Sequence, residues 1–390
     1  MSRAAFHLAA RYVLRHRLQS ALLAGALGLV FALPLCLRTL MDHAQRELRA
    51  RAASTPQVVG TRGSALDLMM TALYFKRENL PPLPMAALTT LRQGGHHAAV
   101  IPLHVRYHSQ GAPIVGTDLD YISFRGLRIA EGKNLTRLGD CVVGAALARK
   151  RGLRPGGHVF SSPEQAFDMA GVYPLKMRVT GILTGNGTPD DDAVFVDLKT
   201  AWLIEGRSHG HNDLAENKSA VLKQEDHNIV GNASVMMFNE VTDLNLGFFH
   251  FHGDPTTFPL SAVLVLPDNA KAEALLAGRY ARSKEEQIIR PQDEMEALLA
   301  QLVRLEGYAS SAFLVAATAA LLVTALVFAL TFRLRRREFQ TLEEVGVSRV
   351  ALMSVQVLEI TLIAAGATLI GALLFAIASY TAPHLLRMAV

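Results

Sequence analysis

The sequence predicts an α+β protein with three transmembrane α-helices and a large α+β extracytoplasmic domain inserted between the first and the second helix. Half of the 390 residues are hydrophobic and the mean hydropathy is +0.23, yet charged residues still make up 19% of the chain. This mixture is typical of a few membrane spans joined to a sizeable water-exposed domain. The longest apolar runs lie towards the two ends, and the middle of the chain mixes strand and helix patterns.

Three uncharged runs are the candidate membrane spans, at residues 21–37, 309–332 and 360–382. About 20 apolar residues are needed to cross the bilayer core, so the second and third runs are long enough as they stand. The first run is shorter, but Arg38 can extend its side chain to the membrane interface. A cleaved signal peptide is the alternative for this run. A charged, helix-like stretch follows it in place of a small-residue cleavage site, so we predict an uncleaved anchor.

Arginines orient these spans. They cluster before the first run and between the second and third runs, which the positive-inside rule places in the cytoplasm. Because the arginines cluster beside apolar runs, we assign the net charge of +5 to a role at the inner face of the membrane. No nucleic-acid partner is expected, although a basic protein could also bind nucleic acid. The expected organisation is a cytoplasmic amphipathic helix at 1–18, spans at 19–41, 309–333 and 350–382, a periplasmic domain at 42–308, a cytoplasmic helix at 334–349 and a periplasmic tail at 383–390.

The middle segment supports the α+β prediction. The stretch "HAAVIPLHVRYHSQGAPIVGTDLDYI" alternates in the manner of strands, and "LSAVLVLPDNAKAEALLAG" predicts a strand followed by a helix. The segment is long enough to bury a hydrophobic core of its own.

The segment between the second and third spans, "RLRRREFQTLEEVGVSR", is a candidate docking helix. Phe339, Leu342 and Val345 recur every three residues and would form a narrow apolar stripe on a short helix. Gly346 would end that helix. Arginines that only fix topology do not need such a stripe, so we predict that the helix docks on a cytosolic partner.

The same stretch resembles the cytoplasmic signature of the FtsX/MacB-like ABC transporter permease family. The shared features are a basic run, an amphipathic helix led by Glu338, a glycine at 346, the Ser348–Arg349 pair and Glu359 at the start of the next span. The stretch "LAARYVLRHRLQSALLAGALGL" resembles the family's first span, and "GTDLDYISFRGLRIAEGKNL", "VVGAALARKRGLRPGGHVF" and "VTGIL" resemble its extracytoplasmic core. The resemblance thus covers nearly the whole chain, although the family has three spans after its outer domain and this sequence offers two.

The resemblance implies a permease of the mechanotransmission type. Such a subunit works as a homodimer in the bacterial inner membrane with a separate cytoplasmic ATP-binding subunit, and a periplasmic accessory or substrate-binding protein is a further candidate partner. The sequence contains no G-x-x-x-x-G-K-[ST] phosphate loop, in agreement with ATP hydrolysis on another chain. No enzymatic activity is expected of this subunit itself, and Glu359 is expected to be an interface residue rather than a proton relay. The implied coupling residues are Glu338, Phe339, Leu342, Val345, Gly346, Ser348 and Arg349.

Residues 205–252 depart from the resemblance because they are rich in histidine. In an extended strand the two rings of an H-x-H pair share one face, and imidazole is a ligand for zinc, copper and nickel. We therefore predict a candidate zinc site from two such pairs, with a solvated loop as the alternative; the histidines concerned are His209, His211, His250 and His252, with His227 as a replacement ligand.

Four functions remain open on this basis. The first is ATP-dependent envelope transport, and the second is a zinc-linked version of it. The third is a non-transport regulator of an envelope enzyme. The fourth, ranked last, is a membrane-anchored metallohydrolase, because "HGHND" resembles the H-x-H-x-D motif of metallo-β-lactamase-like enzymes but has Leu214 where that motif needs a histidine.

Overall fold

A computed structural model describes residues 3–76, 80–162, 174–210, 221–225, 228–231 and 238–389. The chain divides into two compact units. We call Arg49–Glu296 the core domain, and Met1–Leu48 together with Ala297–Val390 the helical unit.

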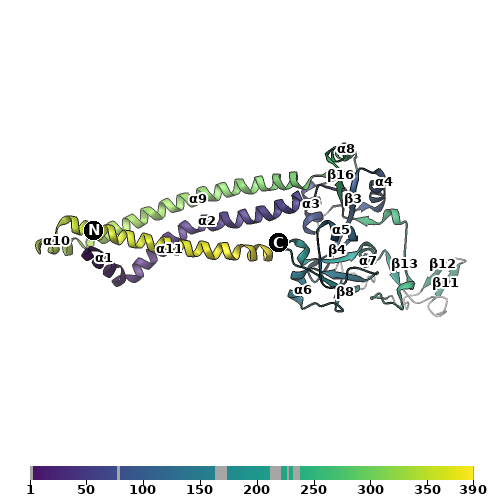
Figure 1. Ribbon diagram of the computed structural model, residues 1–390, viewed down its shortest axis with the longest axis horizontal. Coiled ribbons are helices and arrows are strands. Elements are labelled where there is room, and N and C mark those ends of the chain that lie inside the picture. The colour runs from purple at the N-terminus through teal and green to yellow at the C-terminus, as the bar shows by residue number, and fades with distance from the viewer. Residues whose placement is uncertain are drawn as a thin grey trace. The chain divides into compact units, whose positions relative to one another are not determined.

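The core domain is built on a mixed sheet, which has ten strands within the described residues (Figure 1). Their order is β16-β1-β15-β3-β4-β9-β6-β8-β5, with β7 beside β8. The pairs β4–β9 and β6–β8 are parallel, and the other pairs are antiparallel. The strands are β1 (Gln57–Thr61), β3 (His97–Ser109), β4 (Ala112–Thr117), β5 (Ile129–Gly132), β6 (Asp140–Val143), β7 (His158–Phe160), β8 (Lys176–Leu183), β9 (Val194–Asp197), β15 (Ala262–Pro267) and β16 (Glu286–Ile289).

The alternation predicted from "HAAVIPLHVRYHSQGAPIVGT" forms the β3–β4 hairpin. Its two-residue loop, Gln110 and Gly111, has positive φ at both positions, 47° and 89°. This is the geometry that a type I′ turn requires, and it matches the right-handed twist of the paired strands. The hairpin lies at the centre of the sheet order.

Two hydrophobic cores lie in the core domain, and helix α7 contributes to both. Core one includes Cys141, Met177 and Val196, and core two includes Val59, Leu88 and Val263. Helix α6 packs on core one, whereas α4 and α8 pack on core two. The helices of this domain are α3 (Ala65–Tyr74), α4 (Met85–Gly94), α5 (Leu119–Phe124), α6 (Ala145–Arg151), α7 (Leu198–Ile204) and α8 (Ala270–Ala281). Three short ribbons complete it, β2 (Leu83–Pro84) with β14 (Pro259–Leu260), β10 (Ser208–Gly210) with β13 (Phe249–Phe251), and β11 (Val221–Glu225) with β12 (Asn228–Gly231).

The helical unit confirms the three predicted apolar helices. Within the described residues, α2 (Arg17–Ala53), α9 (Pro291–Leu334) and α11 (Arg349–Ala389) each contain a stretch long and apolar enough to cross a membrane. One precedes the core domain and two follow it. Two short helices accompany them, α1 (Arg3–Arg15) and α10 (Arg336–Glu344).

Helices α2 and α9 extend further than the apolar runs. The sequence places the end of the first span at 41 and the start of the second at 309, yet α2 continues to Ala53 and α9 begins at Pro291. Loss of hydropathy marks where a helix leaves an apolar environment, whereas the backbone hydrogen bonds of the helix continue through charged sequence. The compact core domain is correspondingly shorter than the expected 42–308.

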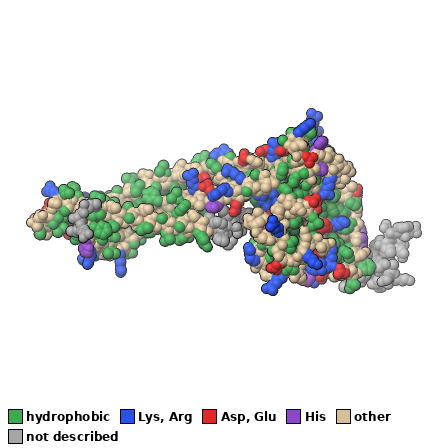
Figure 2. Space-filling view, in the orientation of Figure 1, with side chains coloured by type: hydrophobic (Ala, Val, Ile, Leu, Met, Phe, Trp, Pro, Cys, Tyr) green, Lys and Arg blue, Asp and Glu red, His purple; other side chains and the backbone are tan. Residues whose placement is uncertain are grey.

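Small residues allow the helices of the helical unit to pack closely. Ala5 and Ala9 of α1 pack against Val355 and Leu358 of α11. A Cβ at Gly28 of α2 would lie only 2.8 Å from the carbonyl oxygen of Ala367 in α11, so this approach requires glycine. By contrast, none of the residues in the most apolar stretch of α9 is buried within the chain. Hydrophobic side chains cover much of the surface of the helical unit that Figure 2 shows.

Candidate coupling helix, buried ion pairs and histidine cluster

Helix α10 is stopped by the glycine that the sequence singles out. The amide of Gly346 donates to the carbonyl of Glu343 at 2.9 Å, and the amide of Val347 donates to the carbonyl of Leu342 at 3.0 Å. With Val345 as the C-cap and Gly346 at φ 98°, this is a Schellman motif, in which a left-handed residue follows the helix. The predicted helix stop is confirmed.

The predicted apolar stripe is not continuous. Val345 lies beyond the last helical residue, Glu344, and is 78% exposed. Phe339 is half-buried, and its ring centroid lies 4.9 Å from the guanidinium carbon of Arg335. Leu342 is 40% exposed. The exposed apolar surface at the end of α10 therefore consists of Leu342 in the helix and Val345 just after it, while Phe339 packs within the chain.

The polar residues of the predicted set flank this surface. The amide of Ala351 donates to Ser348 Oγ at 3.3 Å, an N-cap contact at the start of α11. Arg349 Nε donates to Glu343 Oε1 at 2.9 Å, an exposed ion pair across the turn between α10 and α11. Glu338 Oε2 lies 3.4 Å from Arg335 Nε. The contacts of Ser348 and Arg349 thus lie at the turn between α10 and α11, and that of Glu338 lies at the start of α10.

Arg335 joins three helices, a role that the sequence analysis missed. Its Nη1 donates to both carboxylate oxygens of Glu359 in α11, at 2.9 and 3.0 Å, and the Glu359 side chain is almost fully buried. Its guanidinium carbon also lies 3.7 Å from the ring centroid of Tyr12 in α1. Charge-assisted and cation–π contacts thus fix the beginning of α10 against α1 and α11. The interface role expected of Glu359 stays a prediction; the structure shows that its carboxylate pairs with Arg335 within the chain.

A second buried ion pair lies inside the core domain. Arg51, in the last turn of α2, donates from Nη1 to Asp190 Oδ2 at 2.7 Å and from Nη2 to Asp190 Oδ1 at 3.1 Å. The Tyr121 hydroxyl donates to Asp190 Oδ1 at 2.7 Å, and the Thr188 hydroxyl donates to Oδ2 at 2.8 Å. The side chains of Arg51 and Asp190 are 6% and 1% exposed. Sequence patterns give no signal for this pair, because "GNGTPDDD" has the composition of an ordinary acidic loop.

The charge states in this network follow from its geometry. Burial alone would raise the pKa of the Asp190 carboxyl, but the charge of Arg51 and the hydrogen bonds from Arg51, Tyr121 and Thr188 outweigh it and hold the pKa below 3.8. Burial raises the pKa of the Tyr121 hydroxyl far above 10, so the hydroxyl remains a donor. The end of α2 is therefore bound to the domain by an ionised, bidentate pair.

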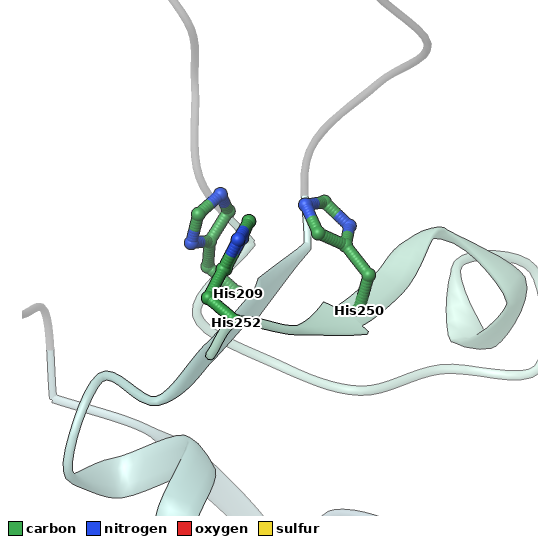
Figure 3. A group of neighbouring side chains, drawn as sticks. All are labelled: His209, His250 and His252. Carbon is green, nitrogen blue, oxygen red and sulfur yellow. The ribbon is translucent and has the colours of Figure 1, made fainter. Parts of the chain in front are cut away.

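Three of the five candidate metal-binding histidines lie together (Figure 3). His209 is in β10, His250 is in β13 and His252 follows β13, and one potential ligand atom from each lies within 4.8 Å of the others. The ring centroids are 4.6 to 4.9 Å apart. His209 is half-buried, and the other two are exposed. His211 and His227 lie outside the described residues.

Comparison with known families identifies the chain. The model of the MacB-like periplasmic core domain matches residues 20–236, which is more than half of the 390 residues. The chain belongs to the MacB-like periplasmic core domain family. The FtsX/MacB-like ABC permease resemblance inferred from the sequence is thereby confirmed.

Solved MacB-like structures are distant from this chain. The periplasmic region of MacB from Actinobacillus actinomycetemcomitans is 11% identical, covers 63% of this chain and 92% of its own, and has a TM-score of 0.35. The extracellular domain of the noncanonic ABC-type transporter YknZ from Gram-positive bacteria is 13% identical, covers 60% of this chain and 99% of its own, and has a TM-score of 0.33. No curated protein matches the chain.

Membership in the MacB-like family implies an ABC transporter with an ATPase partner. A periplasmic-type domain with three candidate membrane helices indicates a membrane protein with an extracytoplasmic domain. The family match ends at residue 236, so His209 lies inside it whereas His250 and His252 lie beyond it.

Proposed function

We propose that this chain is the permease subunit of an ABC transporter of the mechanotransmission type. A separate cytoplasmic ATPase would hydrolyse ATP, and the motion would reach the core domain in the periplasm to drive envelope transport. The observation that carries this proposal is α10, a short helix that is capped by Gly346, fixed by Arg335 and lies between two membrane-length helices. Leu342 in this helix and Val345 just after it are exposed to solvent, which suits docking on a partner protein.

The proposed assembly has two permease chains and ATPase subunits in the bacterial inner membrane. No residue in the most apolar stretch of α9 is buried within the chain, so lipid or a second copy of the chain would cover this stretch. A periplasmic accessory or substrate-binding protein remains part of the proposal. The second candidate function, zinc-linked transport, is favoured by the cluster of His209, His250 and His252.

The proposed topology is tested by labelling introduced cysteines. Lys150, on α6 of the core domain, and Arg337, on α10, are both exposed. In a variant without Cys36 and Cys141, Lys150→Cys should react with an impermeant maleimide in spheroplasts. Arg337→Cys should react only after the inner membrane is permeabilised. Labelling of both sites in sealed spheroplasts would contradict the assigned orientation.

The coupling role is tested by Leu342→Asp. A charge in place of one of the two exposed apolar side chains at the end of α10 should reduce stimulation of the ATPase about 30-fold, since a buried interface anchor contributes about 2 kcal/mol or more to binding. Membrane insertion should be unchanged. The measurements are copurification of the ATPase in mild detergent and its rate in proteoliposomes.

The matched control is Gln340→Asp, which places the same charge on the same helix at an exposed polar position. This variant should keep nearly full stimulation. Equal activity of both variants with the parent chain would show that α10 is not the docking element.

A further inference from the structure

We propose that His209, His250 and His252 bind a divalent cation of the zinc class through three imidazole nitrogens, with the fourth coordination position open. The site lies on the core domain, away from α10 in the sequence, so it does not depend on the proposed coupling role. The family match does not extend to two of its three residues.

The register of the β10–β13 ribbon places the histidines together. Its antiparallel pairs are Ser208 with Phe251, His209 with His250, and Gly210 with Phe249. Residues directly opposite each other in such a pair have Cβ atoms about 4.5–5.5 Å apart. His252 is two residues beyond His250, so the alternation of an extended chain places it on the face of His250. Figure 3 shows the three rings on the same side of the ribbon.

In "FHFH" (residues 249–252) alternate side chains point to opposite faces of the ribbon, and the two phenylalanines anchor the face opposite the histidines. Phe249 packs against core one, and Phe251 packs against core two. Phe251 also lies 6.0 Å from Phe258, centroid to centroid. Because alternate side chains are held by the hydrophobic cores, the intervening histidines must project outwards.

Further contacts fix the backbone beneath the imidazoles. The Ser208 hydroxyl donates to the carbonyl of His250 at 2.8 Å, and the amide of His252 donates to the carbonyl of Arg207 at 2.9 Å. A Cβ at Gly210 would lie 2.9 Å from the ring of Phe249, so only glycine allows this packing. A fixed backbone limits the reorganisation that metal binding needs.

One histidine already has the supporting contact that metal ligands use. Nδ1 of His250 lies 3.1 Å from the carbonyl oxygen of Phe248. When Nδ1 donates its proton there, the lone pair is on Nε2. A metal-bound histidine usually donates its other ring N–H to such a carbonyl, which fixes both the tautomer and the ring orientation.

The spacing requires only side-chain adjustment. Two nitrogens on one tetrahedral zinc are about 3.3 Å apart, given Zn–N distances near 2.0–2.1 Å. The potential ligand atoms lie within 4.8 Å of one another, so rotation about the side-chain bonds, which is least restricted for the exposed His250 and His252, can close the difference.

The donor set selects the kind of ion. The described group contains three imidazoles and no carboxylate. Imidazole suits zinc, copper and nickel, whereas magnesium and calcium require oxygen ligands. Structural zinc sites are closed by four protein ligands, while three ligands leave a position for water or an incoming group. The site therefore suits exchange of the metal with its surroundings rather than permanent support of the fold.

The test uses the full chain in mild detergent and zinc chloride alone. Calorimetry should show about one equivalent bound to the parent chain. In the variant His250→Gln with His252→Gln, affinity should fall by more than the roughly 10- to 100-fold that loss of a supporting partner costs a metal site. The control variant, His7→Gln with His96→Asn, also removes two exposed imidazoles and should bind as the parent does.

A second measurement reports the ligands directly. Cobalt(II) bound to the parent chain should give the visible absorption of a nitrogen-rich, four-coordinate site, and the double glutamine variant should not give it. Unchanged thermal unfolding without metal would show that this variant is folded. Zinc binding of equal strength in the double variant, or no zinc binding by the parent chain, would overturn the proposal, and neither result bears on ATPase stimulation through α10.

Discussion

Arg51→Met is expected to destabilise the core domain by about 3–5 kcal/mol, because it leaves the Asp190 carboxylate buried without its cation. Asp190 is only 1% exposed, so water cannot replace the lost partner. A loss of this size should lower the midpoint of thermal unfolding by roughly 10 °C in a domain of this length. Arg49→Met is the matched control: it removes an exposed arginine two residues earlier on the same helix and should shift the midpoint little.

Two further variants separate the ion pair from simple packing. Adding Asp190→Leu to Arg51→Met should restore part of the stability, since no unpaired charge remains. The pKa of Asp190 is lowered in the folded domain, so its contribution to stability is present above about pH 3.8 and is lost as the pH falls through the lowered pKa. Asp190→Asn should remove that acid-dependent loss. A shift as small for Arg51→Met as for Arg49→Met would show that the pair contributes little.

Arg335→Met is expected to impair both folding of the helical unit and ATPase coupling. The substitution leaves the Glu359 carboxylate buried and removes the cation that contacts Tyr12 and Phe339. Breaking a buried pair by removing one partner costs about 3–5 kcal/mol. Thermal unfolding in detergent and ATPase stimulation in proteoliposomes would measure the two effects, with the exposed neighbour Arg336→Met as control.

Exchange of the charges tests whether the pair itself is required. The double variant Arg335→Glu with Glu359→Arg should recover stability relative to either single substitution. Recovery of stability without recovery of ATPase stimulation would assign Arg335 a positioning role for α10. Full coupling in Arg335→Met alone would contradict the role given to the pair.

Local patterns in the sequence were sufficient for the α+β class and the three long helices, but not for the order of the strands in the sheet. The apolar runs predicted the three long helices, and alternation predicted strands in the stretch that forms the β3–β4 hairpin. Gly346 predicted the end of α10, but Val345 lies past that end because the C-cap already leaves the helix. Spacing of three residues indicates a shared face only while the helix continues.

Contacts between residues distant in the sequence were not predictable in the same way. Arg51 and Asp190 are 139 positions apart, and neither stands out from the many exposed arginines and aspartates of the chain. In the sequence Arg335 is one arginine of a basic run, and only the packing of α1, α10 and α11 distinguishes it from Arg336. The histidines differ, because H-x-H alternation is local and rare, so the sequence could propose the group before the pairing of β10 with β13 was known.

Helix α7 and strand β13 both tie the two cores of the core domain to each other. Trp202 of α7 packs in core two while Ala201 and Leu203 pack in core one, and β13 repeats the pattern with Phe251 and Phe249. Because α7 and β13 each contribute side chains to both cores, we expect the two cores to move together as one rigid body when a force is applied to either of them. His250 alternates with Phe249 and Phe251 on β13 and His252 follows it, so the backbone spacing between His250 and His252 would change only if the packing of the phenylalanines changed.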